Sequence, residues 1–364
     1  MRVLVVNAGS SSLKLRLLDE HDHVEHRADL PADPRGFDAS DLAELLEGWG
    51  QPEVIGHRIV HGGRTFTGPV RIDDGVRTQL QQLTDLAPLH QPKSLAALDA
   101  VTAHLPDVMA VACFDTAFHT TIPEAAATYA VPREWRQRYG IRRYGFHGLS
   151  HAYCSRRAAQ LLDRSLTGLR IVTCHLGAGA SLAAILDGRS VDTTMGFTPL
   201  EGLVMATRSG TVDPGLVLWL EEHEHLSPHE VATALEERSG LTALAGTGDM
   251  REVEAAAARG DPDALLAIEV YIHRLVGGIA AMTAAIGGLD VLAFTGGVGE
   301  HSPTVRRLAA EKLEFLGVAI NAGSNEITRD DGDMSAPGAA ARTVVIAARE
   351  DLQIAHEVRS LRGY

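Results

Sequence analysis

The chain has little of several features that would narrow its function at once. Aromatic residues make up only 5% of its 364 residues, so alanine, valine, leucine and glycine must supply the packing of any core. Its three cysteines are an odd number without a C-x-x-C spacing, which favours buried thiols in a reducing cytoplasm over a disulfide framework. No segment stays apolar for long enough to span a bilayer, so we expect a soluble, cytoplasmic protein.

Positive charge is also scarce. The formal net charge is −14 at pH 7. Nucleic acids and anionic membranes need a basic face on their partner, so we expect neither of them to be one. An anionic substrate must instead be met by local cationic groups. With 45% hydrophobic and 22% charged residues, the chain has the balance of an ordinary globular protein and is long enough for two domains.

Short β-rich runs alternate with helical patterns along the whole chain, which predicts α/β layers. The predicted strands are residues 3–6, 15–18, 108–113, 170–174, 182–186, 291–294, 317–320 and 343–346. The predicted helices are residues 41–47, 92–103, 149–162, 230–238 and 262–286. No low-complexity linker interrupts the alternation, so composition alone places no domain boundary.

The most informative segment is a small-residue turn at residues 7–14, between the apolar run 3–6 and the second strand-like run. Its backbone N–H groups, its three serine hydroxyls and Lys14 suit an anion such as phosphate. The spacing is not that of a Walker P-loop, and a returning strand rather than a helix follows, so the phosphates would lie on a hairpin. An ordinary surface turn is the alternative, and the motif alone slightly favours it.

The same plan recurs later in the chain. A predicted strand at 170–174 leads into the turn from His175 to Ser181, and a returning strand follows. A third turn, from Thr295 to Glu300, comes after the apolar strand 291–294 and before a helix predicted to begin near Ser302. Three small-residue turns at strand ends indicate a ligand site more strongly than any one of them.

Six motifs together resemble the signatures of the acetate kinases. They are NAGSSSLK at 7–14, HRIVHGG at 57–63, FDTAFH at 114–119, YGFHG at 144–148, MGFTPLEG at 195–202 and FTGGVGE at 294–300. The resemblance implies an α/β fold of two duplicated actin-like (ribonuclease H-like) domains with the active site in the interdomain cleft. The implied first domain is residues 1–116 plus 351–364, and the second is residues 117–350. A homodimer is the family expectation.

The resemblance also implies an activity: reversible, Mg²⁺-dependent transfer of the γ-phosphoryl group of ATP to acetate, giving acetyl phosphate and ADP, with Mn²⁺ as the alternative metal. Two other functions stay open. One is a kinase for propionate or another short-chain carboxylate. The other is a catalytically silent, actin-like nucleotide-binding switch.

The same resemblance implies a set of site residues. The implied catalytic residues are Asp115, His147 and Arg208. The acid would contact Arg58, Val60, Leu89, Phe146 and Pro199. ATP or ADP would contact Ser10, Ser12, Lys14, His175, Leu176, Gly177, Ala178, Gly179, Asp249, Met250, Arg251, Gly297, Val298, Gly299, Glu300 and His301. The metal would be held by Asn7 and Glu350, hard oxygen ligands that suit a hard cation.

Each of the central residues has a plainer alternative from the sequence alone. Arg58 suits a structural ion pair with an acid, and His147 suits a hydrogen-bonded core histidine. Asp115 suits a helix N-cap, and Glu350 suits an acidic group facing a helix dipole.

The chain departs from the family pattern at four single positions and in the segment 244–248, where the family has a serine-bearing loop. Ala178 stands where the family usually has asparagine, which removes one phosphate hydrogen bond. Ala206 replaces a usual glycine, Thr211 a usual aspartate and His301 a usual asparagine. These departures predict altered contacts on the nucleotide side of a working enzyme.

Overall fold

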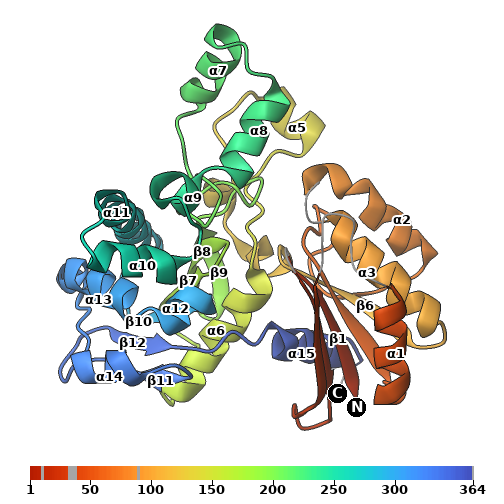
Figure 1. Ribbon diagram of the computed structural model, residues 1–364. Coiled ribbons are helices and arrows are strands. Elements are labelled where there is room, and N and C mark those ends of the chain that lie inside the picture. The colour runs from red at the N-terminus through yellow and green to blue at the C-terminus, as the bar shows by residue number, and fades with distance from the viewer. Residues whose placement is uncertain (10–11, 32–38, 88–90, 363–364) are drawn as a thin grey trace. The chain divides into compact units, whose positions relative to one another are not determined.

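The computed structural model describes residues 1–9, 12–31, 39–87 and 91–362, which form two compact units (Figure 1). The first unit comprises Met1–Thr120, Phe146–Tyr153 and Arg349–Tyr364, and the second comprises Thr121–Gly145 and Cys154–Ala348. This division differs from the expected domain boundaries mainly at Phe146–Tyr153. That segment groups with the first unit, where the Gly148 N–H donates to the Asp115 carbonyl at 2.9 Å.

The first unit contains a six-stranded mixed sheet in the order β3-β2-β1-β4-β6-β5. Its strands are β1 (Val3–Ala8), β2 (Ser12–Leu18), β3 (Val24–Pro31), β4 (Val54–Ile59), β5 (Val70–Arg71) and β6 (Met109–Phe114). In β2 the leucines at 13, 15 and 17 are buried while Lys14 is exposed, as the alternation of a strand with one covered face requires. In β1, Val3 to Val6 are all buried because both faces of the central strands are covered.

The second unit contains another six-stranded sheet, in the order β11-β12-β10-β7-β8-β9. Its strands are β7 (Arg170–Leu176), β8 (Ala180–Leu186), β9 (Arg189–Thr193), β10 (Val291–Thr295), β11 (Gly332–Asp333) and β12 (Arg342–Val345).

The two sheets have the same topology. In each, three antiparallel strands are followed by two parallel pairings and a last, two-residue antiparallel strand. The hairpin β1–β2 therefore corresponds to β7–β8, and Asn7, two residues before Gly9, corresponds to His175, two residues before Gly177. The repeat expected from the sequence is thus a duplicated sheet.

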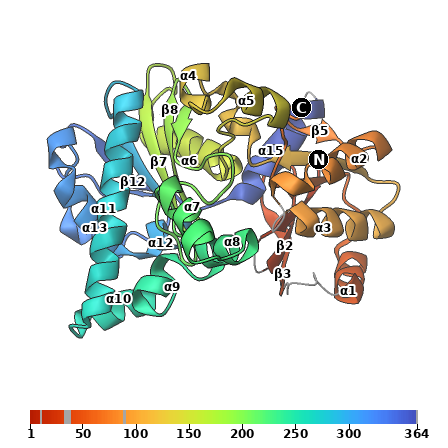
Figure 2. The same cartoon turned by 90° about the horizontal axis from the view of Figure 1, so that it is seen from above.

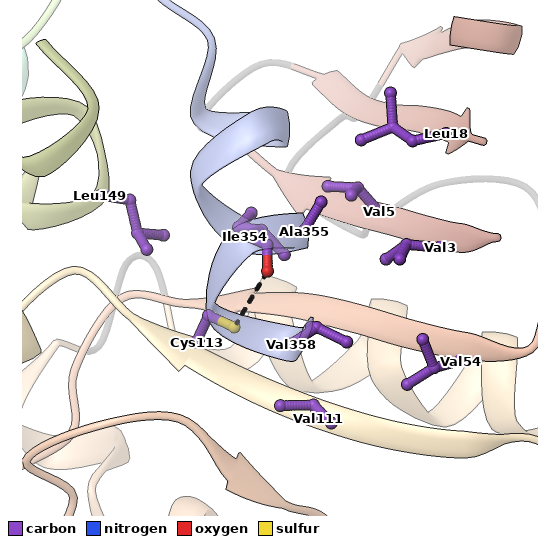
Figure 3. Packing of buried hydrophobic residues seen from close by; sticks show 10 residues of the cluster. All are labelled: Val3, Val5, Leu18, Val54, Val111, Cys113, Leu149, Ile354, Ala355 and Val358. Atoms are coloured by element: carbon purple, nitrogen blue, oxygen red, sulfur yellow. Dashed lines mark hydrogen bonds between the residues drawn. The ribbon is translucent and has the colours of Figure 1, made fainter. Parts of the chain in front are cut away.

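Helices cover both faces of the first sheet. They are α1 (Ala39–Trp49), α2 (Asp74–Gln82), α3 (Gln91–His104), α15 (Glu350–Arg362) and the first part of α6 (Gly148–Leu161), with the 3₁₀ turns η1 (Thr84–Leu86) and η2 (Ala117–Thr121). On one face, residues of α1 and α3 pack on leucines of β1 and β2. On the other face, Ile354, Ala355 and Val358 of α15 pack on Val3, Val54 and Val111 (Figure 3). The last helix of the chain therefore completes the first unit.

The helices of the second unit are α4 (Glu124–Ala127), α5 (Arg133–Tyr139), α7 (Pro214–His223), α8 (Pro228–Glu237), α9 (Gly240–Ala245), α10 (Met250–Ala258), α11 (Pro262–Ala285), α12 (Gly296–His301), α13 (Pro303–Lys312) and α14 (Ala322–Ile327), with the 3₁₀ turn η3 (Glu314–Leu316). The longest, α11, begins at the N-cap Asp261 and Pro262 and lies against β7, β8 and β9 (Figure 2).

Two expectations from the sequence are wrong, and one is incomplete. The segment 317–320 is not a strand but makes isolated bridges at Val318 and Ile320. The helix expected near Ser302 is confirmed as α13, with Ser302 as its N-cap, but the turn expected before it is itself largely helical, because α12 already begins at Gly296. Finally, α11 is long and apolar enough to cross a membrane by length and composition. Core helices also pass that test, and its buried residues, including Ile272, Leu275 and Ile279, contribute to the second unit's interior.

Gly56 marks where α15 approaches the sheet most closely, and it yields a stability prediction. A Cβ atom at Gly56 would lie 2.5 Å from Ile354 Cγ2 and 2.9 Å from Val358 Cγ2. We expect Gly56→Ala to lower the free energy of unfolding by about 1–3 kcal/mol, the usual cost of overpacking a core. Urea unfolding followed by circular dichroism measures the change.

Gly48→Ala is the matched control, because Gly48 lies within α1 and an added Cβ atom there meets nothing within 4 Å. This variant is expected to be as stable as the parent or up to about 1 kcal/mol more stable, as alanine is the better helix former. An unchanged unfolding midpoint for Gly56→Ala would contradict the packing of α15 on β4.

Candidate functional site

Arg58 and Asp115 form the centre of a polar cluster in the first unit. Arg58 is the fifth residue of β4, and Asp115 directly follows the neighbouring parallel strand β6. The Arg58 Nε donates to both Asp115 oxygens at 3.1 Å, and Nη2 donates to Oδ2 at 2.6 Å. Only 13% of the Arg58 side chain and 1% of Asp115 are exposed. Arg58 therefore has the ion pair that the plainer sequence alternative predicted, and its role as a substrate clamp stays a prediction.

Asn7 and Glu350 extend this cluster. Asn7 Nδ2 donates to Glu350 Oε2 at 2.7 Å, while Arg58 Nη1 donates to Asn7 Oδ1 at 3.1 Å. Arg58 Nη1 also lies 3.7 Å from Glu350 Oε2. Asn7 comes from β1 and Glu350 is the first residue of α15, so residues 343 positions apart in sequence meet around one guanidinium.

The electrostatics of the cluster are those of a buried charge network. Burial opposes the charge of Arg58, but the carboxylates of Asp115 and Glu350 raise its pKa above the usual value. Burial raises the pKa of Asp115, against the opposing effects of Arg58 and of the His147 N–H group. The guanidinium is therefore a permanent cation held beside two acids and an amide.

His147 is placed by the same aspartate. It has a φ of 56°, a left-handed conformation that few non-glycine residues adopt. Its N–H group bonds to the Asp115 carboxylate, the next N–H, of Gly148, bonds to the Asp115 carbonyl, and the His147 carbonyl accepts from His151 N at 2.9 Å. Such conformations cost free energy and persist where the surroundings enforce them, often at functional sites.

The residues expected around the acid's alkyl group are divided between the two units. Val60 and Phe146 are buried in the first unit, where Phe146 lies edge-on to His61 with ring centroids 5.5 Å apart. Pro199 belongs to the second unit. Leu89 lies outside the described residues.

The β1–β2 hairpin carries the first phosphate-loop candidates. Ser12 is the first residue of β2. Lys14 lies directly opposite Asn7 in the antiparallel pair, so the side chains of Lys14 and Asn7 point to the same face of the sheet. Gly9 N–H closes the turn on the Ser12 carbonyl at 2.9 Å. Ser10 lies outside the described residues.

The equivalent hairpin of the second unit carries the second set. His175 and Leu176 end β7, and Gly177, Ala178 and Gly179 form the turn, closed by Gly177 N–H on the Gly179 carbonyl at 3.0 Å. A Cβ atom at Gly296 would lie 2.8 Å from the Leu176 carbonyl oxygen, and one at Gly177 would lie 4.0 Å from Gly297 N. The turn and the start of α12 are thus brought together.

Three of the predicted nucleotide residues make contacts within the protein. Glu300 accepts from the N–H groups of Gly296 and Ala348 at 2.9 and 3.0 Å, and burial raises its pKa. Asp249 caps α10 and is paired with Arg251 at 2.5 Å. Of the other five residues in the segments 249–251 and 297–301, Met250 and Gly299 are buried, Val298 is half-buried, and Gly297 and His301 are exposed.

Arg208 lies in the second unit and is largely buried. Its Nη1 donates to the Pro199 carbonyl at 3.3 Å, and burial lowers its pKa while Glu236 opposes that effect. Two of the family departures, Ala206 and Thr211, lie within three residues of Arg208 in the sequence. Ala206 N–H donates to the carbonyl of a third departure, Ala178, at 3.0 Å, and Thr211 Oγ1 accepts from Gly202 N–H at 3.1 Å.

Sequence reasoning missed four residues that organise these loops. Arg306 is completely buried and donates to the carbonyls of Gly299 and Glu300 at the end of α12. The other three, Tyr129, Arg143 and Glu201, form a hydrogen-bonded group. Only the position of Glu201 within the motif at 195–202 hinted at a role, because a buried arginine or tyrosine has no local sequence signature.

Comparison with known proteins shows which family the chain is similar to. Residues 39–356 match the model of the acetokinase family. The chain is 44% identical to an acetate kinase of Clavibacter sepedonicus, over 99% of each chain. It resembles the crystal structure of Porphyromonas gingivalis acetate kinase with a TM-score of 0.89 and 35% identity over 99% of each chain. A propionate kinase from Francisella tularensis gives the same TM-score and identity over 98% of each chain.

His57, beside Arg58, yields a pH prediction. It is 1% exposed, and its ring nitrogens have no hydrogen-bond partner in the described part of the chain. Burial lowers its pKa to about 3, with Asp99 opposing. Below pH 6.5 the unfolded chain binds a proton that the folded one does not, so His57 destabilises the fold increasingly as the pH falls, by about 1.4 kcal/mol per pH unit.

We therefore expect His57→Leu to flatten the dependence of unfolding free energy on pH between pH 6 and 4, measured by urea titrations at fixed pH. His21→Leu is the control, because 71% of the His21 side chain is exposed, and it should leave the slope unchanged. Equal slopes for His57→Leu and the parent would rule out His57 as the source. Burial also lowers the pKa of His61, to about 4, so some slope will remain in both proteins.

Proposed function

Because the chain belongs to the acetokinase family, we propose that it is an acetate kinase, which reversibly transfers the γ-phosphoryl group of ATP to the carboxylate of acetate. The products are acetyl phosphate and ADP. The observation that supports this most directly is the cluster of Asn7, Arg58, Asp115 and Glu350, since three residues from distant parts of the chain meet around the buried guanidinium of Arg58.

The chemistry requires such cations. A carboxylate that attacks a triphosphate is an anion approaching a polyanion, and each pair of unit charges at 4 Å costs about 4 kcal/mol at an effective dielectric of 20. Phosphoryl transfer needs little covalent help, so catalysis consists mainly of positioning and of neutralising charge. In a chain with a net charge of −14, Arg58 and Arg208 are the groups we assign to this work.

Arg58 would bind the substrate carboxylate. Its guanidinium is already oriented by Asp115 and Asn7. The Arg58 side chain would therefore lose little conformational freedom when acetate binds. Asp115 would act by holding Arg58 and the strained backbone of His147 in place. His147 and Arg208 would then donate hydrogen bonds to the phosphoryl group as it moves between the two oxygens.

The acid's methyl group would face Val60, Leu89, Phe146 and Pro199. A hydrophobic pocket distinguishes substrates that differ by one methylene by only about 1–3 kcal/mol. Propionate is therefore the second candidate substrate, and the equal similarity to a solved propionate kinase favours keeping it.

A divalent metal fits the first unit. Asn7 Oδ1 and the Glu350 carboxylate are hard oxygen donors, and no group of three or more His, Cys, Asp or Glu side chains suited to a metal occurs among the described residues. A site with so few protein ligands suits Mg²⁺, which is usually held by one or two protein oxygens together with water and phosphate. Mn²⁺ is the alternative metal. Asn7 and Glu350 would hold the metal, and it would neutralise charge on the phosphate oxygens.

ATP would be bound by the two hairpins and the loops of the second unit. Ser10, Ser12 and Lys14 would contribute from the first hairpin, and His175 to Gly179 from the second. Asp249 to Arg251 and Gly297 to His301 would line the adenosine site. We further propose that the protein works as a homodimer in the cytoplasm, where its three buried thiols would stay reduced.

The activity is tested by incubating the protein with Mg²⁺-ATP and acetate, propionate or butyrate and trapping the acyl phosphate as a hydroxamate. We expect hydroxamate to form from acetate at the highest rate.

We expect Arg208→Ala to lower kcat about 10³-fold. A loss of this size is within the range measured for arginines that stabilise a transferring phosphoryl group. Arg307→Ala is the matched control, because Arg307 is half exposed on α13 and paired with Glu311.

A faster rate with propionate would transfer the assignment to the second candidate. No hydroxamate from any acid would reject both kinase assignments in favour of a nucleotide-binding switch, and a near-normal rate for Arg208→Ala would remove that residue from the mechanism.

The metal assignment is tested with Glu350→Gln, which keeps the size of the side chain but removes its charge. We expect the Mg²⁺ concentration for half-maximal activity to rise tenfold or more, as for losses from a metal's coordination sphere. Mn²⁺ binding in the presence of ADP, followed by electron paramagnetic resonance, should weaken in parallel.

Glu311→Gln, an exposed substitution on α13, controls for the lost negative charge. Unaltered Mg²⁺ dependence in Glu350→Gln would show that Glu350 is not a metal ligand. A residue other than Glu350 would then have to bind the metal together with Asn7.

A further inference from the structure

We propose that Tyr129, Arg143 and Glu201 form a positioning cluster that fixes the loop 193–201 and, through the Pro199 carbonyl, the guanidinium of Arg208. All of these residues belong to the second unit. The inference rests on the proposed function only for what Arg208 does in the reaction, whereas the mechanical link to Arg208 is independent of it.

Glu201 is the centre of the cluster. Its Oε2 accepts from the Tyr129 hydroxyl, and its Oε1 accepts from Arg143 Nη2 at 2.6 Å. Because each carboxylate oxygen accepts from a different donor, the orientation of the Glu201 carboxylate is fixed. Glu201 lies at the C-terminal end of the loop, two residues after Pro199.

Arg143 holds the beginning of the same loop. Its Nη1 donates to three successive carbonyls, of Thr193, Thr194 and Met195, at 3.1, 3.1 and 3.0 Å. The guanidinium also lies over the Tyr129 ring, 5.6 Å from its centroid. A planar fork is needed to reach a carboxylate and a run of carbonyls together, which lysine lacks. Burial opposes the charge of Arg143, but Tyr129 and Glu201 raise its pKa, so it stays charged.

Tyr129 holds the middle of the loop. Its hydroxyl accepts from the Phe197 N–H at 3.0 Å while it donates to Glu201. Burial and Glu201 raise the pKa of Tyr129, so the phenol keeps the proton that it donates. At Gly196 a Cβ atom would collide with both the Glu201 carboxylate and the Tyr129 hydroxyl, so the cluster closes directly over a glycine.

Within this loop, Pro199 contacts Arg208. Residues 193–197 and Glu201 are anchored on either side of Pro199, and the Pro199 carbonyl accepts from Arg208 Nη1 at 3.3 Å. An arginine that stabilises a phosphoryl group must be placed accurately, since small displacements of a reacting contact are costly. The cluster therefore acts through Arg208 without contacting a ligand.

The first test observes Arg208 directly. In protein labelled with ¹⁵N-arginine, the Arg208 side-chain signals are identified by their loss in Arg208→Ala. We expect Tyr129→Phe to shift these signals and Tyr139→Phe to leave them in place. Tyr139 is the matched control because it is 55% exposed on α5 of the same unit. Arg143→Lys should shift the Arg208 signals as well.

The second test is kinetic. Tyr129→Phe should lower kcat about tenfold, as the loss of a hydrogen bond to a charged group allows, with the KM for ATP changed less than about twofold. In the Arg208→Ala background the same substitution should change kcat by less than about twofold, because its effect passes through the missing side chain.

The outcomes separate this proposal from the proposed function. Arg208 signals that do not move in Tyr129→Phe would overturn the positioning cluster, whatever reaction the protein catalyses. Equal losses of kcat in both backgrounds would also overturn it and leave a merely structural role. If the parent protein forms no acyl phosphate, the proposed function fails, while the arginine signals still decide whether the cluster holds Arg208.

Discussion

A charged aspartate buried beside an arginine is the constraint on which the first unit depends. The Asp115 carboxylate accepts from Arg58 and from the His147 backbone, and its carbonyl accepts from Gly148 N–H. Removing one partner of such a pair leaves the other charge buried without compensation, which costs about 3–5 kcal/mol. Asp115 thereby joins β4, the end of β6 and the start of α6, and it holds Arg58 and His147 in place.

The duplicated sheets place different side chains at equivalent hairpins. The β1–β2 hairpin presents Asn7, which meets Glu350 and Arg58, whereas the equivalent hairpin presents His175 beside a glycine turn and α12. The same strand geometry thus places an amide near the candidate metal ligands in one unit and a histidine near the candidate nucleotide loops in the other.

The departures from the family pattern gather in the second unit. Ala178 and Ala206 are joined by a backbone hydrogen bond, and the Ala206 carbonyl accepts from the Thr242 backbone and hydroxyl. Two small side chains therefore replace family residues at one contact, while the positioning cluster and the Arg58 network keep their hydrogen bonds. Altered nucleotide contacts are consistent with an otherwise complete set of candidate catalytic groups.

Local patterns in the sequence determined most of the central strands, the two hairpins and several of the long helices, because apolar alternation and small-residue turns act over a few residues. The motifs determined the family, and the resemblance named Asn7, Arg58, Asp115 and Glu350. The local patterns did not reveal the central strand β4, the strands β3 and β9, the two-residue edge strands β5 and β11, or the start of α12 at Gly296. Only the tertiary structure decided that Arg58 binds Asp115 and Asn7, and that Tyr129, Arg143 and Glu201 meet. Those contacts join residues far apart in the chain, and the partner of a buried charge is set by packing rather than by its neighbours in sequence.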